Sequence, residues 1–518
     1  MINNGRVYKD QQSLNTAIRG VCDVLRRSNC ASALQYIPEL TWILFLRILD
    51  EKEAFEARKI DSKYISSLEL PYRWSDWAAP IQYKRLLEAS MDSNSAIGWK
   101  RQALLTQGPN ALLEFVNNNL FPYLRSLKNF KDATPRQKVI GEVFSNIERT
   151  RIDSQSNLLD ILNKVHNISL ETVDGTHIFA LSQAYEGLLL KMGEKKNDGG
   201  QFFTPREIIR AMIQTIGPTV GETIYDPCCG TGGFLAQVYE FMLASLHGDT
   251  SEEEMAKLKH RTFFGREKDN LVYPITLANL IIHGIDDPHI WHGNTLTKKA
   301  IYDGLFQGSP ELFDVILTNP PFGGKEGKDA QSQFVHQTSA TQILFLQHVI
   351  DHLKLGGRCG IVVDEGVLFR TNDAFYHTKK RLLQECNLWC IVSLPTGVFA
   401  NAGTSIKTNL LFFTKGSPTK KIWYYDMSSM KVLRKSPFTL EAFNDFFKLF
   451  PTEAISSQSW TVDIKQLEAR KYDLKAVNPH LTFVDNFETI DELVEQIEAE
   501  METVSELLRE AGSWQKNS

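Results

Sequence analysis

The pattern of hydrophobic and polar positions changes after about residue 165. Before that point apolar side chains recur every three or four positions, as in Leu14, Ile18, Val21 and Leu25, which is the spacing of one helix face. The nearly continuous apolar run at 42–49 is followed by acids and is interpreted as a helix packed in a core. Residues 1–165 are therefore predicted to form a helical domain.

From residue 222 onward short apolar runs alternate with helical patterns, and a further helix is expected at 178–192. The expected strands are 223–226, 262–266, 288–292, 312–318, 358–363, 388–394 and 406–414. One helix is expected to start at 233, and three more are expected at 270–283, 340–354 and 373–385. This alternation predicts an α/β fold with a doubly wound, mostly parallel sheet. The last two strands have no helix between them, which predicts one antiparallel member.

The sheet domain is assigned to residues 166–435 and a C-terminal tail to 436–518, with a strand-like run at 422–425 before it. Thr489 and Glu492 form a capping-box pattern at the start of a helix in the tail. Its near-heptad apolar stripe consists of Ile490, Leu493, Ile497, Met501, Val504 and Leu508. At ~1.5 Å per residue this helix would extend ~35 Å. Binding to a partner chain and packing on the core of this chain are equally compatible with the stripe.

Asn319-Pro320-Pro321-Phe322 follows the apolar run 313–317 directly, at the carboxyl end of a predicted strand, where open α/β sheets bind ligands. The exocyclic amine of a nucleobase is a poor nucleophile because its lone pair is delocalised into the ring. The Asn319 amide oxygen and the Pro320 carbonyl can accept its two hydrogens, and Phe322 offers a face on which an extruded base can stack. An ordinary turn that ends a strand explains the tetrapeptide alone equally well.

A glycine-rich turn lies between the first predicted strand and its helix. Gly230, Gly232 and Gly233 allow a tight turn and a close approach to a ligand, and the helix offers free N–H groups. The spacing differs from the dinucleotide fingerprint, and the lysine of a P-loop is missing. Glu267 ends the next strand, where a carboxylate can accept hydrogen bonds from ribose hydroxyls. A solvated charge beside Arg266 is the alternative interpretation of Glu267.

Four motifs in this order resemble the modification (M) subunits of type I restriction-modification systems, which are S-adenosyl-L-methionine-dependent DNA adenine-N6 methyltransferases. The motifs are Gly200-Gln201-Phe202-Phe203-Thr204-Pro205-Arg206, Asp226-Pro227-Cys228-Cys229-Gly230-Thr231-Gly232-Gly233, Glu267 and Asn319-Pro320-Pro321-Phe322. The resemblance is strong over residues 180–415 and looser in the N-terminal helical region. It implies that this helical region closes over DNA.

The resemblance also implies the site residues. Those that would hold S-adenosyl-L-methionine are Gln201, Phe202, Phe203, Thr204, Asp226, Pro227, Gly230, Thr231, Gly232, Gly233, Glu267, Asn294 and Asn319. Those that would act on an adenine flipped out of duplex DNA are Asn319, Pro320, Pro321 and Phe322. No metal is implied.

Three of these positions have second interpretations. Asn294 stands where the family commonly has an aspartate that accepts the adenine amine of the cofactor, and a turn asparagine fits equally well. Thr204 can cap the following helix as well as bind ligand. Pro227-Cys228 matches the dipeptide of cytosine-C5 methyltransferases, but it lies in the glycine-rich turn, whereas Asn319 follows the fourth strand. Methylation of an amine is therefore favoured.

Composition limits how the chain can meet DNA. The chain of 518 residues has a net charge of -5, whereas a protein that holds DNA unaided usually carries a basic excess. Either the positive field is local or a partner brings the DNA. The basic residues between positions 123 and 151, Arg136 among them, are interpreted as a solvated helix face rather than a DNA contact. Seven cysteines without a disulfide or metal pattern, and no signal peptide or membrane span, favour the cytoplasm.

The order of motifs bears on partners. About a hundred residues follow Lys415, which leaves little room for a domain that reads a base sequence. The resemblance implies a separate specificity (S) subunit, together with a second copy of this chain and a restriction (R) subunit. Methyltransferases of RNA bases or of protein glutamine use similar chemistry, and a non-catalytic clamp could keep the fold. The helical N-terminal domain and the tail favour the DNA assembly, and intact Asn319 and Glu267 argue against the clamp.

Overall fold

The structure is a computed structural model that describes residues 11–30, 32–59, 64–81, 97–167, 204–246, 251–297, 304–399, 406–432 and 438–480. The expected helix at 178–192, the residues Gln201, Phe202 and Phe203, and the expected helix of the tail lie outside these ranges.

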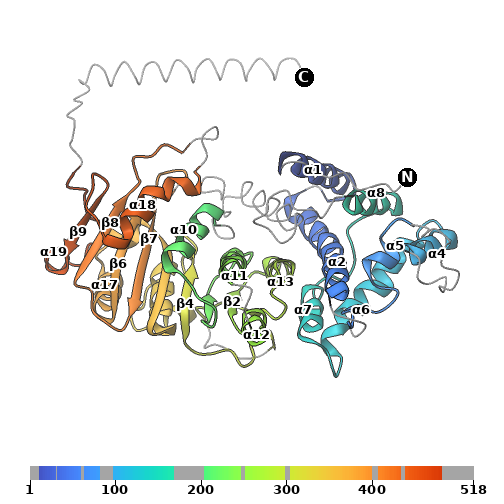
Figure 1. The fold of residues 1–518 in the computed structure, drawn as a ribbon, viewed down its shortest axis with the longest axis horizontal. Helices are drawn as coiled ribbons and strands as arrows, with labels where there is room; N and C mark the ends of the chain where they lie inside the picture. Colours follow the sequence, from blue (N-terminus) through green and yellow to red (C-terminus); the bar gives the residue numbers. More distant parts are fainter. Residues whose placement is uncertain are drawn as a thin grey trace, which may run out of the picture.

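The N-terminal part is helical, as its periodicity predicted (Figure 1). Its helices are α1 (Gln11–Arg27), α2 (Ala33–Lys59), α3 (Trp74–Trp77), α4 (Trp99–Gln107), α5 (Ala111–Phe115), α6 (Phe121–Ser126), α7 (Pro135–Val143) and α8 (Gln155–His166). The apolar run 42–49 is buried along α2. Trp42 begins this run, and its ring lies 5.2 Å from that of Phe121 and 6.5 Å from that of Trp77. Aromatic packing therefore joins α2 to α3 and α6.

The described part of the second domain contains a nine-stranded sheet with the order β3-β2-β1-β4-β5-β7-β6-β8-β9. Its strands are β1 (Ile224–Asp226), β2 (Phe263–Glu267), β3 (His289–His292), β4 (Phe313–Thr318), β5 (Leu353–Asp364), β6 (Cys386–Ser393), β7 (Thr408–Lys415), β8 (Lys421–Asp426) and β9 (Ser459–Asp463). Strands β1 to β5 pair in parallel, and β7 is antiparallel to both β5 and β6, as predicted. β5 begins at Leu353, so the preceding helix is shorter than expected.

Helices cover both faces of the sheet, which makes it doubly wound. α10 (Arg206–Ile216), α11 (Gly233–Ser245) and α13 (Val272–His283) share a core with Val315 and Leu317 of β4. α15 (Thr341–His352) and α17 (Asp373–Glu385) pack on the other face, which carries Ile316. Adjacent residues of β4 thus point to opposite cores, and both faces of this strand are buried.

Shorter helices complete the second domain. They are α12 (Glu252–His260), α14 (Lys328–Gln331), α16 (Glu365–Phe369), α18 (Asn444–Leu449) and α19 (Ile464–Ala469). β9 pairs antiparallel with β8, and Phe446 of α18 packs against Trp423 of β8 with ring centroids 5.8 Å apart. The sheet therefore continues beyond residue 435, into the region predicted to be a C-terminal tail.

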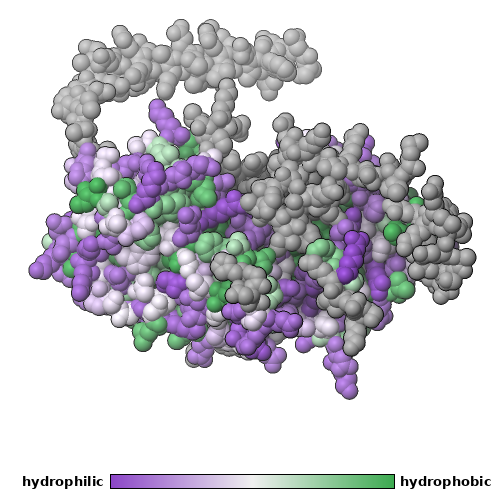
Figure 2. All heavy atoms as spheres, viewed as in Figure 1, coloured by the Kyte–Doolittle hydropathy of each residue, from purple (hydrophilic) through white to green (hydrophobic). Residues whose placement is uncertain are grey.

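Figure 2 shows hydrophilic residues over much of the visible described surface, with smaller groups of hydrophobic residues between them. This is the surface expected of domains whose large apolar side chains lie in a core. Among the described helices, none combines the length and apolarity needed to cross a membrane.

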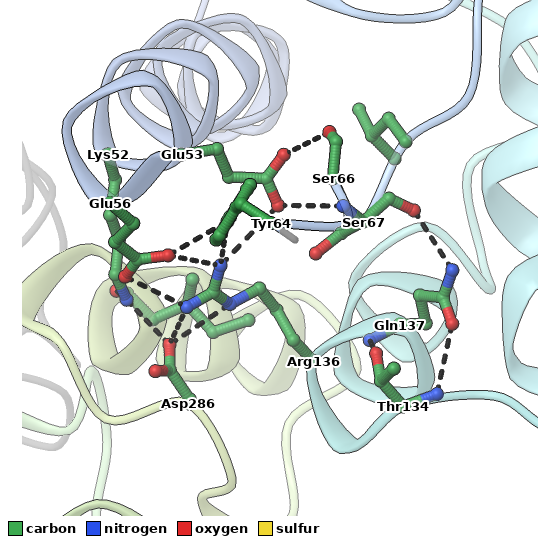
Figure 3. Close-up of polar contacts among 12 residues, drawn as sticks. Lys52, Glu53, Glu56, Tyr64, Ser66, Ser67, Thr134, Arg136, Gln137 and Asp286 are labelled. Carbon is green, nitrogen blue, oxygen red and sulfur yellow. Dashed lines mark hydrogen bonds and ion pairs between the residues drawn. The ribbon is translucent and has the colours of Figure 1, made fainter. Parts of the chain in front are cut away.

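The two domains meet where α2 and α7 pack on α13. Arg136 of α7 lies in this interface, where it pairs with Glu56 of α2 and with Asp286, just beyond α13 (Figure 3). The interpretation of Arg136 as part of a solvated helix face was therefore wrong. Neighbouring acids from two other segments hold its guanidinium, and spacing along one helix does not reveal them.

Candidate active site

The predicted site residues meet at the carboxyl edge of the sheet. β1 and β4 are parallel neighbours, with Ile224 opposite Val315, and the order of strands reverses between them. In open α/β sheets such a switch point leaves a crevice for ligands. The two strand ends are tied together, because the Thr318 hydroxyl donates to Asp226 Oδ1 at 2.7 Å.

Asn319, the residue after β4, is buried, and among the described residues only the nitrogen of its carboxamide has a partner. Its Nδ2 donates to Thr204 Oγ1 at 2.9 Å. Its Oδ1 is buried and accepts no hydrogen bond from the described residues. An unmet buried acceptor costs about 1–3 kcal/mol. This oxygen is therefore placed to accept a hydrogen from a ligand, which an amine can supply.

The rest of the tetrapeptide is held by residues from elsewhere in the chain. The Pro320 carbonyl accepts from Gln342 Nε2 at 3.3 Å, and Gln342 Oε1 accepts from the Asp364 amide at 3.0 Å. The ring of Phe322 is partly exposed and meets Phe399 edge-on at 5.5 Å. The carbonyl and the ring next to Asn319 are thus both fixed from outside the motif.

The glycine-rich turn leads from β1 into α11. Gly230 and Gly232 have φ angles of 53° and 80°, which side chains with a Cβ adopt with strain. α11 begins at Gly233, and the first N–H groups of a helix have no acceptor within it. Two residues of α13 hold the turn from behind: Thr276 Oγ1 donates to the Gly230 carbonyl, and Asn279 Nδ2 donates to the Thr231 carbonyl at 2.9 Å.

Glu267 lies at the end of β2 beside the turn. Its carboxylate accepts from the Gly230 amide at 3.0 Å and from the Asp269 amide at 2.8 Å. Burial raises the pKa of Glu267 to about 7, against the effect of these two hydrogen bonds. Burial likewise raises the pKa of Asp226 to about 7, and the nearby Glu267 carboxylate adds to the rise. Two carboxyl groups that titrate near neutral pH therefore border the turn.

Two adjacent cavities open at this edge. One is lined by Thr204, Asp226, Gly230 and Asn319 together with other residues of the turn. The other is lined by residues that include Glu267, Asn294, Pro321 and Phe345. Cys228 belongs to the lining of both. Asn319 and the glycine turn therefore line the first cavity, and Pro321 and Glu267 line the second, with Cys228 between them.

The structure also bears on the three positions with second interpretations. Asn294 Oδ1 accepts from the Leu296 amide at 3.0 Å, so its side chain closes a turn, while the residue also lines the second cavity. Thr204 does not cap α10, whose N-cap is Pro205; its hydroxyl binds Asn319 instead. Burial and the Asp226 carboxylate raise the pKa of Cys228 well above its ordinary value. A neutral thiol is a poor nucleophile, which disfavours attack by Cys228.

Four polar residues of the site were not found by sequence reasoning. They are Thr318, Gln342, Thr276 and Asn279. Each makes at least one hydrogen bond to a segment 22 or more residues away in the chain. Thr318 directly precedes the Asn-Pro-Pro-Phe motif, and this position could have indicated a role in the site. The other three lie on helices whose sequences are mostly apolar and indicate only packing.

Methyltransferases that act on exocyclic amines combine a glycine turn after the first strand, an acid after the second and an Asn-Pro-Pro-aromatic sequence after the fourth. The fold and the crevice place this chain in that class.

Comparisons with known proteins give the family. Residues 176–485 match the model of N-6 DNA Methylase, and residues 14–165 match the HsdM N-terminal domain. The chain is 34% identical to the type I restriction enzyme EcoEI methylase subunit of Escherichia coli over 96% of each chain. A solved modification subunit of a putative type I restriction enzyme from Vibrio vulnificus is 30% identical, covers 90% of this chain and 97% of its own, and has a TM-score of 0.76. A chain from a structure of the type I R-M system is 33% identical over 98% and 99% of the two chains, with a TM-score of 0.70.

The chain therefore belongs to the N-6 DNA methylase family, as a modification (M) subunit of type I restriction-modification systems. The predicted family, α/β fold with an N-terminal helical region, and adenine-N6 DNA methyltransferase activity are confirmed. The roles of individual residues stay predictions.

Proposed function

We propose that this subunit transfers a methyl group from S-adenosyl-L-methionine to adenine N6 at defined DNA sites, with the sequence read by a separate specificity subunit. The observation that carries the proposal is the buried Asn319 Oδ1, which has no hydrogen-bond partner among the described residues and lies beside the glycine turn. An exocyclic N–H is the donor that this oxygen lacks.

The residues of the crevice fit the cofactor. Glu267 would accept hydrogen bonds from the ribose, Pro321 and Phe345 would flank the adenine ring, and Thr204 would border the methionine end together with the turn. Buried carboxyl groups suit a ligand that carries positive charge on sulfur and on its amino group. When bound there, S-adenosyl-L-methionine supplies a methyl group on a sulfonium centre.

Asn319 and Pro320 would prepare the adenine amine. Asn319 Oδ1 accepts one N6 hydrogen and the Pro320 carbonyl accepts the other, which draws the nitrogen toward sp³ geometry and frees its lone pair. Phe322 stacks on the extruded base. The new N–C bond forms as the bond between the methyl group and sulfur breaks. The methylated amine then releases its acidic proton to solvent, so no strong general base is required.

The assembly would contain duplex DNA, the specificity subunit, a second copy of this chain and a restriction subunit, in the cytoplasm. The net charge of -5 supports the requirement for a partner that brings the DNA. The unstacking of an adenine costs a few kcal/mol, which contacts made by the whole complex must offset.

Substitution of Asn319 tests the proposal. In the complex with the specificity subunit, Asn319→Ala is expected to abolish transfer of a tritiated methyl group to duplex DNA, because the N6 hydrogens lose an acceptor. Calorimetry is expected to show that S-adenosyl-L-methionine still binds. Retained turnover would refute the catalytic role of Asn319.

RNA and protein offered in parallel serve as controls. We expect label in DNA alone, on adenine N6. Cys228→Ser is the matched variant on the neighbouring strand end, and it is expected to retain far more activity than Asn319→Ala because its thiol takes no part in the chemistry.

A further inference from the structure

Helix α13 lies between the glycine turn and the N-terminal domain. It packs on α11, the helix that follows the glycine turn, and on α2 and α7 of the helical domain (Figure 1). Any shift of α13 therefore reaches both parts of the molecule.

Toward the crevice, α13 holds two consecutive carbonyl groups of the turn. The donors are the Thr276 hydroxyl, to Gly230, and the Asn279 amide, to Thr231, and both side chains are buried. The amide of Gly230 donates to the Glu267 carboxylate at 3.0 Å. Gly230 is thus fixed on one side by the proposed ribose acceptor and on the other by α13.

The helix also touches the turn directly. A Cβ at Gly232 would lie 3.2 Å from both Leu280 Cδ2 and Thr276 Cγ2. Contacts this short leave no space between the turn and α13, so the position of the helix fixes the position of the turn.

At its other end, α13 is followed by Asp286, which two cations of the N-terminal domain bind. Lys52 Nζ of α2 lies 2.6 Å from Asp286 Oδ1, and Arg136 Nη2 of α7 lies 2.9 Å from it. Lys52 Nζ also donates to the carbonyl of Ile281, within α13, at 3.2 Å. Arg136 in turn pairs with Glu56 of α2 through two hydrogen bonds of 2.9 and 3.1 Å (Figure 3).

These groups lie away from solvent, with Lys52 6% and Asp286 7% exposed. A buried charge that loses its partner is strongly destabilising, so the three groups must stay within hydrogen-bonding distance. The interdomain network of Lys52, Arg136 and Asp286 therefore locks the end of α13 to the helical domain.

We propose that Thr276 and Asn279 are positioning residues for the cofactor turn, and that the interdomain network sets the placement of their helix, so that docking of the N-terminal domain tunes cofactor affinity. The proposal rests on S-adenosyl-L-methionine being the ligand of the turn, as proposed above.

Substitution of Thr276 in the full-length chain tests the first part. Thr276→Val keeps the shape but removes the hydroxyl, and it is expected to weaken S-adenosyl-L-methionine binding about tenfold in calorimetry, the effect of about one hydrogen bond. Thr276→Ser restores the donor and is expected to bind nearly as wild type does. In the complex with the specificity subunit and DNA, Thr276→Val should raise KM for the cofactor while kcat at saturation stays close to wild type.

The outcomes separate the two proposals. A wild-type chain that binds no S-adenosyl-L-methionine refutes the proposed function. Wild-type binding together with equal affinity of Thr276→Val refutes the positioning role alone.

A double-mutant cycle tests the second part. Asp286→Asn weakens the interdomain network and is expected to lower cofactor affinity several-fold, with a smaller further loss when Thr276→Val is already present, because both changes act through α13. Lys52→Met is a second variant of the same network and should behave alike. Unchanged affinity in both network variants, or strictly additive losses in the cycle, overturns the coupling.

Glu39→Gln is the matched control for general destabilisation. Glu39 is a buried acid of α2 that accepts from Trp42 Nε1 and Thr150 Oγ1, within the helical domain. This variant is expected to lower the melting temperature while cofactor affinity stays that of wild type. Equal losses of affinity in Glu39→Gln and Asp286→Asn would show an unspecific effect and overturn the proposal.

Discussion

At the scale of single residues, two neighbouring carboxamides are used differently. Gln342 uses both ends, with its Nε2 donating to Pro320 and its Oε1 accepting from Asp364. Asn319 uses its Nδ2 on Thr204, while its buried Oδ1 has no partner within the described residues. A satisfied amide suits a structural tie, whereas the open oxygen of Asn319 suits recognition of an incoming amine.

Phe322 supplies a prediction about base capture. Phe322→Ala is expected to weaken DNA binding in the complex by about tenfold, because the stacking of a base on an aromatic ring contributes about 1–3 kcal/mol. Phe322→Tyr keeps the ring and serves as the control. The measurement is binding of duplex DNA that carries the recognition site, and unchanged binding by the alanine variant would place the stacking elsewhere.

Glu267 supplies a prediction about pH. Its pKa is raised to about 7 by burial, so the carboxylate that would bind the ribose is present above that pH and is lost below it. S-adenosyl-L-methionine affinity is expected to fall about tenfold between pH 8 and pH 6, in proportion to the ionised fraction. The test is calorimetry across this range.

Glu267→Gln is the control for the pH effect. This variant should bind weakly at every pH, because an amide does not ionise. A pH dependence that survives in Glu267→Gln would assign the titration to Asp226, whose pKa is also about 7.

At the scale of elements, the sequence predicted β1 to β8 and the helices α11, α13, α15 and α17 to within about five residues, because buried strands read as continuous apolar runs. It also predicted the antiparallel β7. It did not predict the shorter helices α12, α14, α16, α18 and α19. It did not predict that the residues around β9 extend the sheet, since a short strand such as Ser459–Asp463 has no periodicity of its own.

The site residues also fall into a group that the sequence predicted and a group that it did not. Asn319, the glycine turn and Glu267 follow strands that run in parallel, so one rule of topology brought them to one edge. Gln342, Thr276 and Arg136 act through contacts between distant segments, and a single sequence does not show which helix faces will meet. The motif identified Thr204 as a site residue, but its hydrogen bond to Asn319 could be seen only in the structure.

Gln342 supplies the element-scale prediction, because it ties the ends of β4 and β5 to α15. Gln342→Met has a similar volume but no hydrogen bonds, so the Pro320 carbonyl loses the group that orients it. We expect kcat for methyl transfer to fall about tenfold or more, with cofactor affinity unchanged, since the residue does not touch the glycine turn. Gln342→Glu keeps the acceptor for Asp364 and removes the donor to Pro320. Equal activity in wild type and both variants would contradict the role of Gln342 in orienting the Pro320 carbonyl.

At the scale of the whole molecule, two domains meet through α2, α7 and α13, and the interface contains buried ion pairs. Buried pairs favour one geometry more than they add stability. The helical domain is thus held in a defined place relative to the crevice, as closure over DNA would require.

The requirement for a partner supplies the prediction at this scale. The purified chain is expected to transfer methyl groups to DNA poorly, because its net charge is -5 and an adenine must be unstacked for transfer. Addition of the specificity subunit should raise the rate at one recurring sequence. The measurement is tritiated methyl transfer with and without that subunit, and efficient modification of a defined site by the chain alone would disprove the division of labour.

The most direct test of the role of Asn319 in adenine-N6 methylation is single-molecule sequencing of cellular DNA. The cells express the specificity subunit with either the wild-type chain or Asn319→Ala. We predict N6-methyladenine at one recurring sequence in the wild-type cells and none at that sequence in the variant cells. Methylated adenine at the same sequence in both, or a methyl group on another base, would contradict the account.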